Sequence, residues 1–478
     1  MQHLITPLFA AAAAVLSTAP AHADLGDQLA KLLPNDGAAF DLFGQSVAIS
    51  GATAIVGTRW DDDSGSDSGS AYLFDTTTGR QIAKLLANDG AAGDNFGFSV
   101  AISGTIAIIG AITDDDNGDD SGSAYLFDIS DPANPTQLFK LLPDDGAADD
   151  LFGRSVAIGG PPGREIAIVG AYQDDDNGIN SGSAYLFDAT TGRQIGKLLP
   201  NDGAANDWFG ISVAISGPPG EEIAIVGALV DDDNGDASGS AYLFDVTRGA
   251  QLAKLLPDDG AAFDRFGRSV AISGAIAIVG AEDDDDNGID SGSVYLFEIS
   301  DLKNPIQIAK FLPNDGAAVD RFGISVAISG TSGSEVAIVA AWGDDDNGDH
   351  SGSAYLIDIS NPEKPSQIAK LLPNDGAAGD FFGSSVAIDG TTAIVGAFFD
   401  DDNGFRSGSA YLFDAAAPGK CPWDVNGDGV VNHHDILEVV HNLGLCDDPD
   451  NCPWDVNGDG VVDGADVSEV ATHFGPCP

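Results

Sequence analysis

The stretch AKLLANDGAAGDNFGFSVAISGTIAIIGAITDDDNGDDSGSAYLFD, residues 83–128, decides the fold. It contains four short apolar segments, in generic form IAKLLP, FGxSVAIS, AIAIVGA and GSAYLFD, separated by Gly, Asp, Asn and Pro. Short segments rich in Val, Ile, Tyr and Phe between such turn residues predict strands rather than helices. The stretch therefore predicts a unit of four β-strands.

The same order of segments recurs seven times, and the dipeptide Phe-Gly marks each copy at intervals of 53, 56, 57, 57, 56 and 60 residues. Seven units of four strands predict an all-β seven-bladed propeller. A parallel β-solenoid is the competing repeat fold, but its rungs are usually much shorter than this period. The marker residues are Phe43, Phe96, Phe152, Phe209, Phe266, Phe322 and Phe382.

The two ends of the array predict how the ring closes. A complete LAKLLP segment, residues 29–34, precedes the first copy, and the last copy stops after SAYLFD, residues 409–414. The N-terminal strand is thus expected to complete a blade begun by the last three strands, which hides an open sheet edge. The small-residue segments SVAIS and AIVGA suit the inner positions of each blade, and each marker Phe is expected to fill the space between blades.

Composition limits the classes of partner. The 478 residues include 20 Lys and Arg against 75 Asp and Glu, a net charge of −55, while 43% of the chain is hydrophobic. This apolar content is enough for a sizeable core. The acidic excess disfavours nucleic acids and anionic membrane surfaces as partners. Cations, neutral glycans and basic proteins fit this charge, and so does adaptation to a saline habitat.

The N-terminus predicts secretion. Residues 4–16 are apolar and rich in alanine, and Ala21-His22-Ala23 supplies the small residues that a signal peptidase needs, although residues 1–3 carry no Lys or Arg. We expect a signal peptide over residues 1–23 and the propeller over residues 24–414. No later segment approaches the ~20 apolar residues of a membrane span, so an extracellular chain without membrane insertion is expected.

An acidic loop follows each AIVGA segment, and six of the seven loops continue as Asn-Gly. Propeller symmetry places all seven loops on one face. Carboxylates and an Asn carbonyl on a Gly-bent loop are oxygen ligands that Ca²⁺ prefers. A solvated turn is the other interpretation, and both stay open here. The candidate metal ligands are Asp114, Asp116, Asp174, Asp176, Asp231, Asp233, Asp344 and Asp346.

An aspartate also stands two residues before each marker Phe. Such an aspartate can join a metal site, but more often it caps a turn. The seven residues are Asp41, Asp94, Asp150, Asp207, Asp264, Asp320 and Asp380.

Composition changes at residues 415–420, a short linker, and a segment duplicated with a period of 31 residues fills 421–478. Its copies begin CPWDVNGDGVVNHHD and CPWDVNGDGVVDGAD. Each carries D-x-N-x-D-G and an Asp at the twelfth loop position, a calcium-loop pattern, and one helix is expected after each loop, from Asp435 to Leu443 and from Asp466 to Phe474. The candidate ligands are Asp424, Asn426, Asp428, the Val430 carbonyl, Asn432, Asp435, Asp455, Asn457, Asp459, the Val461 carbonyl, Asp463 and Asp466.

All four cysteines belong to this duplicated segment. Cys421 and Cys446 are 25 residues apart, as are Cys452 and Cys477, so pairing within each copy is natural. Four cysteines allow three connectivities, and the sequence does not select among them. The secretory signal and the even count favour disulfides over metal thiolates.

These patterns resemble two known families. Phe-Gly with a downstream Val-Gly-Ala resembles the FG-GAP repeats of integrin alpha propellers over residues 24–414, although Thr58 and Ala340 depart from the second element. Integrin calcium loops lie between the two elements, and this interval is too short here for those sites to carry over. Residues 421–478 resemble a dockerin, a small α-helical calcium-loop domain that docks onto cohesins. The positions that contact cohesin in dockerins are His433-His434 and Gly464-Ala465, and their difference disfavours symmetric two-way docking.

The sequence offers few catalytic groups. The propeller contains one histidine, His350, and no P-loop, Rossmann or GxSxG motif, so no catalytic residue is predicted. The expected function is that of a secreted, non-catalytic Ca²⁺-binding protein. Its propeller would present a face to an unknown protein or glycan, as in cell adhesion, and its tail would dock to a cohesin-type or envelope protein. The alternative is an accessory component or enzyme of extracellular polysaccharide breakdown, tethered through the dockerin.

Overall fold

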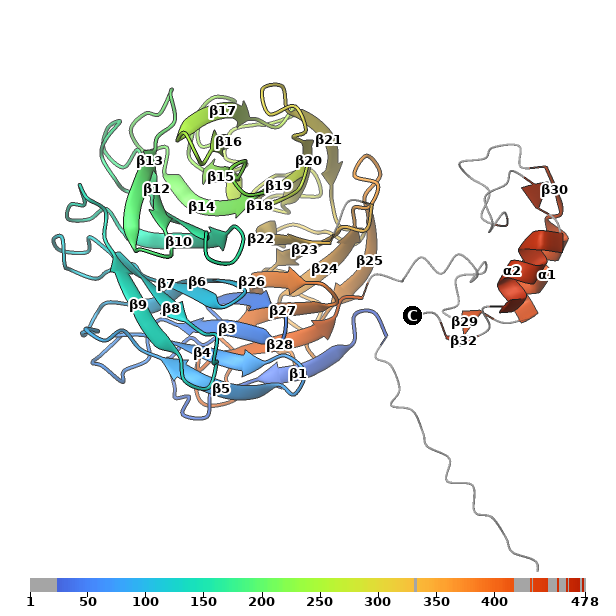
Figure 1. Ribbon diagram of the computed structural model, residues 1–478, viewed down its shortest axis with the longest axis horizontal. Coiled ribbons are helices and arrows are strands. Elements are labelled where there is room, and N and C mark those ends of the chain that lie inside the picture. Colours follow the sequence, from blue (N-terminus) through green and yellow to red (C-terminus); the bar gives the residue numbers. More distant parts are fainter. Residues whose placement is uncertain are drawn as a thin grey trace, which may run out of the picture.

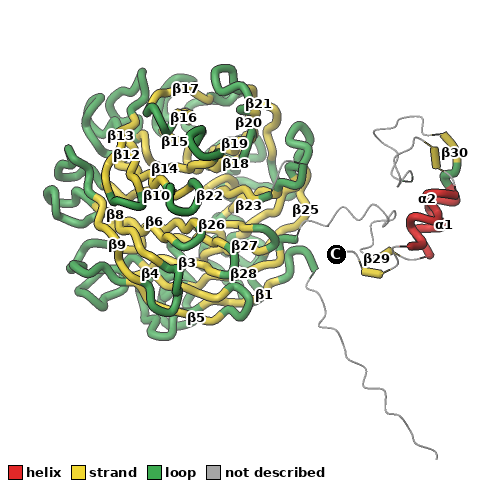
Figure 2. Tube along the Cα trace, in the orientation of Figure 1, coloured by secondary structure: helices red, strands yellow, loops and turns green. Residues whose placement is uncertain are grey.

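The computed structural model describes residues 24–330, 333–416, 430–431, 433–445, 454, 461–462, 464–472 and 475–476. Seven four-stranded antiparallel sheets surround a common centre (Figure 1). The seven-bladed propeller predicted from the repeats is therefore confirmed. The loops that join the strands lie at the ends and the rim of the blades (Figure 2).

Six blades consist of consecutive strands, ordered from the centre outward as FGxSVAIS, AIVGA, SAYLFD and IAKLL. The prediction that SVAIS and AIVGA are the inner strands is confirmed. The six blades are β2 (Ser46–Ser50), β3 (Thr53–Thr58), β4 (Ser70–Asp75) and β5 (Arg80–Leu85); β6 (Phe96–Ser103), β7 (Ile106–Ala111), β8 (Ser123–Asp128) and β9 (Thr136–Leu141); β10 (Phe152–Gly159), β11 (Ile166–Ala171), β12 (Ser183–Asp188) and β13 (Arg193–Leu198); β14 (Phe209–Ser216), β15 (Ile223–Ala228), β16 (Ser240–Asp245) and β17 (Ala250–Leu255); β18 (Phe266–Ser273), β19 (Ile276–Ala281), β20 (Ser293–Glu298) and β21 (Ile306–Phe311); and β22 (Phe322–Ser329), β23 (Val336–Ala341), β24 (Ser353–Asp358) and β25 (Ser366–Leu371).

The seventh blade joins the two ends of the array. It consists of β26 (Phe382–Asp389), β27 (Thr392–Ala397), β28 (Ser409–Asp414) and, outermost, β1 (Gln28–Leu32). Strand β1 pairs antiparallel with β28, with Lys31 opposite Tyr411. The predicted closure is confirmed, and it covers the edge that β28 would otherwise expose.

One contact joins neighbouring blades seven times. The marker Phe forms a parallel bridge with the Gly of SGS in the preceding blade, as between Phe96 and Gly69. Gly97 has a φ of 92°, and a Cβ there would lie 2.1 Å from the Ser70 carbonyl oxygen, so only glycine fits. The Phe96 ring meets the edge of Tyr125 at 5.3 Å in a core built from both blades. The prediction that the Phe fills the space between blades is confirmed.

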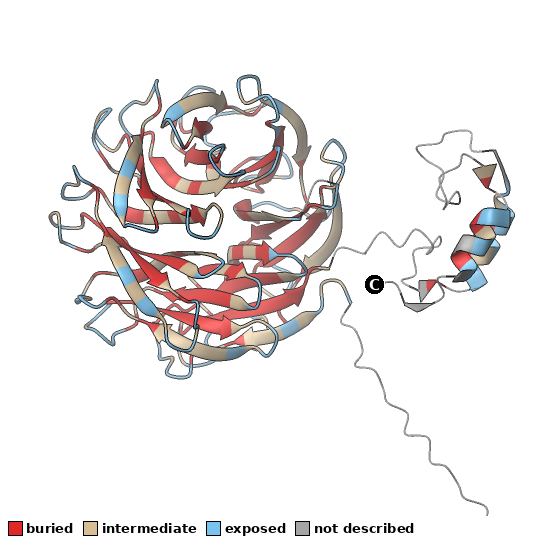
Figure 3. Cartoon of the chain, in the orientation of Figure 1, coloured by how far each residue is buried: buried red, intermediate tan, exposed pale blue. Residues whose placement is uncertain are grey.

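Burial concentrates in the middle of each blade. The second and third strands are buried almost throughout, while the outermost strands hold exposed and intermediate residues and end on a buried one (Figure 3). The innermost strands contact those of both neighbouring blades, which closes a ring around the centre.

The C-terminal region contains two helices that contact each other. Val431, Val439, Val462 and Val470 form its small core, against which Trp454 packs. Both helices begin two residues before their predicted starts, so the twelfth-position aspartates lie in the first turns. The elements are β29 (Val430–Val431), α1 (His433–His441), β30 (Gly444–Leu445), β31 (Val461–Val462), α2 (Gly464–Thr472) and β32 (Gly475–Pro476), and β29 pairs with β32 and β30 with β31. Among the described residues, no helix has both the length and the apolar character to cross a bilayer.

Candidate functional sites

A lysine ammonium lies among the carboxylates of each acidic loop. In the first blade, Lys84 Nζ lies 2.9 Å from a carboxylate oxygen of Asp36, 2.9 Å from one of Asp61 and 2.7 Å from one of Asp63. The Tyr72 hydroxyl donates to Asp61 at 3.0 Å. Asp61 is buried, whereas the side chains of Asp36 and Asp63 are about half exposed. Three carboxylates from two separate loops therefore surround one cation of the protein itself.

This arrangement, here named the lysine cluster, occurs in all seven blades because the lysine comes from the IAKLL strand and the tyrosine from AYLFD. Lys31, Lys84 and Lys310 hold three of the clusters. The eight aspartates predicted as candidate metal ligands belong to the other four: Asp114 and Asp116 contact Lys140, Asp174 and Asp176 contact Lys197, Asp231 and Asp233 contact Lys254, and Asp344 and Asp346 contact Lys370.

The electrostatics of the cluster favour the charged lysine. Burial opposes the charge of Lys84, yet hydrogen bonds to Asp63, Tyr72 and the other two carboxylates raise its pKa above the ordinary value. Burial likewise opposes the charge of Asp36, but the bond from Lys84 lowers the pKa of that carboxyl. The ammonium balances the carboxylates that a calcium ion would need, so calcium binding there would require the lysine to leave.

The remaining polar groups of each acidic loop bond within the loop. Asp62 accepts the backbone N–H of Asp67 at 2.8 Å, and Asp61 accepts that of Asp63 at 3.2 Å. Backbone N–H groups that donate to a side-chain carboxylate two to five residues earlier are typical of a self-capped turn. The turn interpretation thus accounts for the loop geometry, while a metal role for these loops stays a prediction.

Replacing Lys84 with Met is expected to lower the free energy of unfolding by about 3 kcal/mol, because it leaves the buried Asp61 carboxylate beside two others without a cation. Urea unfolding measures the loss. Millimolar calcium is expected to restore part of it, since the vacated cluster still offers three carboxylates. Lys303→Met, at an exposed lysine outside the clusters, is the matched control. Unchanged stability in Lys84→Met would show that the cluster contributes nothing.

The aspartates two residues before the marker Phe cap turns. Asp41 accepts the backbone N–H of Ala38 at 2.6 Å, and Asp94 accepts that of Ala91 at 2.7 Å. The same bond occurs in every copy, which confirms the capping role. Burial, only partly offset by this bond, raises the pKa of Asp41 to about 6. The pKa is also raised at Asp94, and to about 6 at Asp150, Asp207, Asp264, Asp320 and Asp380.

The propeller is therefore expected to melt at a higher temperature near pH 4.5 than near pH 7.5. An unfolded aspartate has a pKa of about 3.9. Between about pH 4 and pH 6 the folded chain binds more protons than the unfolded chain, so stability falls as pH rises. Below about pH 4 the sign reverses, because Asp36, whose pKa is lowered by folding, and its counterparts in other blades must be protonated.

Calorimetry across this pH range measures the effect, with about 0.5 M NaCl to screen the general repulsion of the acidic surface. The double substitution Asp41→Asn and Asp207→Asn removes two of the raised carboxyls and should flatten the slope between pH 4.5 and pH 6. A melting temperature that climbs steadily from pH 4.5 to pH 7.5 would contradict the assignment.

Two of the predicted calcium ligands of the tail lie within the described residues as buried carboxylates. Asp435 and Asp466 are fully buried in the first turns of α1 and α2. Burying an ionised carboxylate is costly unless a helix N-terminus, a hydrogen bond or a metal compensates it. Val430 and Val461, the predicted carbonyl ligands, begin β29 and β31. The other predicted ligands and the cysteines lie outside the described residues: Asp424, Asn426, Asp428, Asn432, Asp455, Asn457, Asp459, Asp463, Cys421, Cys446, Cys452 and Cys477.

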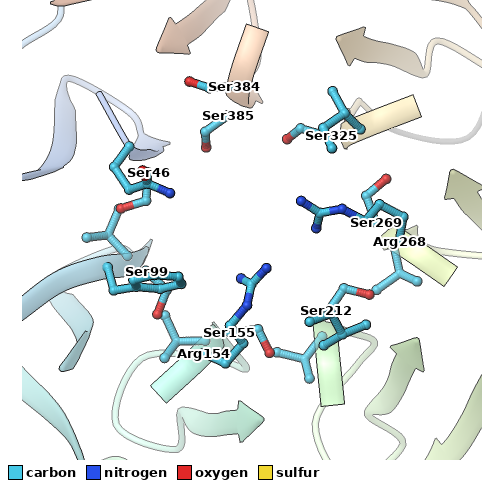
Figure 4. Close-up of a pocket in the computed structure, with 18 of the residues that line it drawn as sticks. Ser46, Ser99, Arg154, Ser155, Ser212, Arg268, Ser269, Ser325, Ser384 and Ser385 are labelled. Carbon is cyan, nitrogen blue, oxygen red and sulfur yellow. The ribbon is translucent and has the colours of Figure 1, made fainter. Parts of the chain in front are cut away.

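The innermost strands enclose a central channel with a cavity of about 230 Å³ (Figure 4). Serines line this channel, and their hydroxyls join the blades. Ser99 Oγ donates to the Gly153 carbonyl at 2.8 Å, and Ser155 Oγ donates to the Gly210 carbonyl at 2.8 Å. The serines thus serve the architecture, as their repetition indicated.

The position after each Phe-Gly also lines the channel, at the end where the acidic loops lie. Figure 4 shows the guanidinium groups of Arg154 and Arg268 pointing into the channel. Sequence reasoning missed this surface, which we name the channel mouth. A position-by-position comparison of the seven copies would identify this surface. The residue after Phe-Gly differs between the copies, whereas the rest of FGxSVAIS is nearly uniform. The seven residues are Gln45, Phe98, Arg154, Ile211, Arg268, Ile324 and Ser384.

Comparison with known families agrees with this architecture. The family described as FG-GAP repeat matches residues 27–74, 80–127, 135–187, 193–244, 250–297, 306–357 and 365–413. The family described as Dockerin type I domain matches residues 422–475. Both families bind Ca²⁺, which is the cofactor expected from the tail loops. No curated protein matches the chain.

Proposed function

The chain belongs to the FG-GAP repeat family, and from that premise we propose that it is a non-catalytic binding protein of the extracellular space. The propeller presents a ligand-binding face, and the dockerin tail holds the chain to a cohesin-type partner in the presence of calcium. Two general properties support this: dockerins bind cohesins, and proteins that carry them are typically extracellular.

The proposal rests on a difference between the polar side chains that recur in every blade and the side chains that vary from blade to blade. The repeated polar side chains bond within the propeller, as Lys84 does with its carboxylates and Ser99 does with a backbone carbonyl. The chemistry that varies between blades gathers at the channel mouth, where Phe98, Arg154 and Arg268 line the opening. A rigid ring with varied side chains at one opening is suited to recognise a ligand there.

Helix α1 offers the better docking face of the tail. Leu437 is 48% exposed and Val440 is 42% exposed, and the exposed His433 and His434 precede them on the same helix. The α2 positions 31 residues further on are Ser468 and Ala471, which have far less apolar surface. Exposed apolar side chains on a helix favour a protein contact. We therefore infer that the tail docks through α1, and not equally well through α1 and α2.

Surface plasmon resonance on immobilised type I cohesins tests the proposal. The full chain is expected to bind in calcium and to be released by EGTA, since the loops that position α1 need the metal. Leu437→Asp with Val440→Asp is expected to weaken binding by about 100-fold or more.

The matched pair Ser468→Asp with Ala471→Asp adds the same charge to α2 and should leave binding unchanged within about two-fold. Equal losses in both pairs would overturn one-sided docking, and failure to bind any cohesin would overturn the proposed role of the tail. Release of reducing ends from a polysaccharide by the full chain would instead support the enzymatic alternative.

A further inference from the structure

The channel mouth concentrates positive charge in a strongly acidic chain. Two of the ten arginines in the sequence belong to it and three more lie around it, although the net charge of the chain is −55. They come from three repeated positions around the innermost strands: after Phe-Gly, before Phe-Gly, and after the AIVGA strand. The five are Arg59, Arg154, Arg265, Arg268 and Arg321.

Two buried carboxylates at the mouth compensate only part of this charge. Glu282 lies 3.1 Å from Arg268 and 3.6 Å from Arg265, and Asp283 lies 3.0 Å from Arg265 and 3.3 Å from Arg321. Arg265, Arg268 and Arg321 share these two carboxylates, and neither carboxylate forms an ion pair with Arg59 or Arg154.

Arg59 and Arg154 are the uncompensated cations. Within the described part of the chain, no carboxylate lies at ion-pair distance from either, and Arg59 Nε is buried without a hydrogen-bond partner. Both guanidinium groups lie over the ring of Phe98, at 5.5 Å for Arg59 and 5.1 Å for Arg154. Burial and the neighbouring charge of Arg268 lower the pKa of Arg154 to about 10. A site with this balance favours an anion.

An open cavity of about 540 Å³ adjoins the channel mouth beside Arg154, within the ~300–1,000 Å³ typical of small-molecule sites. Three arginines and one carboxylate line it: Arg154, Arg265, Arg268 and Glu282. Tyr172 and Trp208 line it as well, and their rings meet edge to face at 5.5 Å. Partly exposed aromatic rings beside guanidinium groups suit a ligand that has both an apolar face and a negative group. A sugar ring that bears a carboxylate has this combination, because its C–H face packs on an aromatic ring while its carboxylate accepts two N–H bonds from arginine.

We propose that the channel mouth binds a uronate residue of an acidic polysaccharide, with Arg154 and Arg268 on the carboxylate and Tyr172 and Trp208 against the sugar ring. This inference rests on the proposed function, since it names the ligand class of the propeller face.

Isothermal titration of the full chain with oligogalacturonate tests the proposal, with the methyl-esterified oligosaccharide as the neutral counterpart. The titration is made in EGTA, so that calcium cannot bridge the ligand to the acidic loops, and at about 0.15 M salt to limit long-range repulsion. The acid is expected to bind at least ten-fold more tightly than its ester. Trp208 emission should change on binding.

Arg154→Gln with Arg268→Gln is expected to weaken binding of the acid at least ten-fold and to remove the preference over the ester. Arg193→Gln, at an exposed arginine on the outer strand β13, is the matched control and should bind as the parent does. Equal binding of acid and ester, undiminished binding by the double variant, or no binding of the acid would each overturn the inference. Binding of the same preparation to cohesin is measured separately. It shows whether a failed uronate inference leaves the proposed docking function intact.

Discussion

A chain that begins at Asn35 instead of Asp24 is expected to melt more than 10 °C below the parent. The deletion removes β1, which supplies the outermost strand of the seventh blade. Leu32, fully buried between the first and last blades, is lost with it, and removing one such core side chain typically costs about 2–5 kcal/mol. Lys31 also leaves, so that Asp400 stays buried without its ammonium.

The same deletion exposes the edge of β28, which then offers unpaired backbone groups to other chains. Calorimetry and size-exclusion chromatography measure both effects, and aggregation is expected alongside the lower melting temperature. A chain truncated after Ala416 is the control, because it removes the other terminus and leaves all seven blades intact. An N-terminal deletion that melts within about 2 °C of the parent would show that β1 does not hold the ring closed.

Removing calcium is expected to unfold the tail and to leave the propeller unchanged. Among the described residues, the tail core has four buried valines with Ile436, Trp454 and Val467 packed against them, which is too little apolar surface to fold a segment of this size alone. If Asp435 and Asp466 ligate the metal as the sequence predicts, its removal takes a positive charge away from two buried carboxylates. Binding of the metal and folding of the tail are therefore expected to be coupled.

Hydrogen exchange detected by mass spectrometry separates the two regions in one experiment. In EGTA, the amides of α1 and α2 should exchange at rates close to those of an unfolded peptide, while protection of the propeller strands should match that in calcium. Asp435→Asn should reproduce the loss in the presence of calcium. Loss of protection around Asp114 or Asp174 on chelation would show that the propeller loops hold calcium in place of their lysines.

The repeats predict the fold because residues close together in the sequence determine the strands and turns of each unit. Phe-Gly, SGS and the small inner segments recur at fixed spacing, so the blade order, the closure and the interblade Phe follow from periodicity alone. The capping role of Asp41 follows in the same way, because its partner is only three residues away.

The lysine clusters were missed for a physical reason. Lys84 and Asp36 are 48 residues apart, and only the register of separate strands brings them to 2.9 Å. In the sequence, the acidic loop and the lysine of IAKLL are separate motifs. On the sequence alone, the carboxylates are therefore candidate ligands of an external cation. The channel mouth does not follow from the repeat pattern, because Arg154 and Arg268 stand at the position of FGxSVAIS where the copies differ.

The central claim is that one chain links a ligand held by its propeller to a scaffold held by its tail. The most direct test is a surface coated with a type I cohesin, to which the full chain and then fluorescent oligogalacturonate are applied. We expect fluorescence to be retained in calcium, to be released by EGTA together with the protein, and to be lost in the chain with Arg154→Gln and Arg268→Gln although that protein still docks. Fluorescence that is never retained by docked protein, or that stays on the surface after EGTA has released the protein, would contradict the claim.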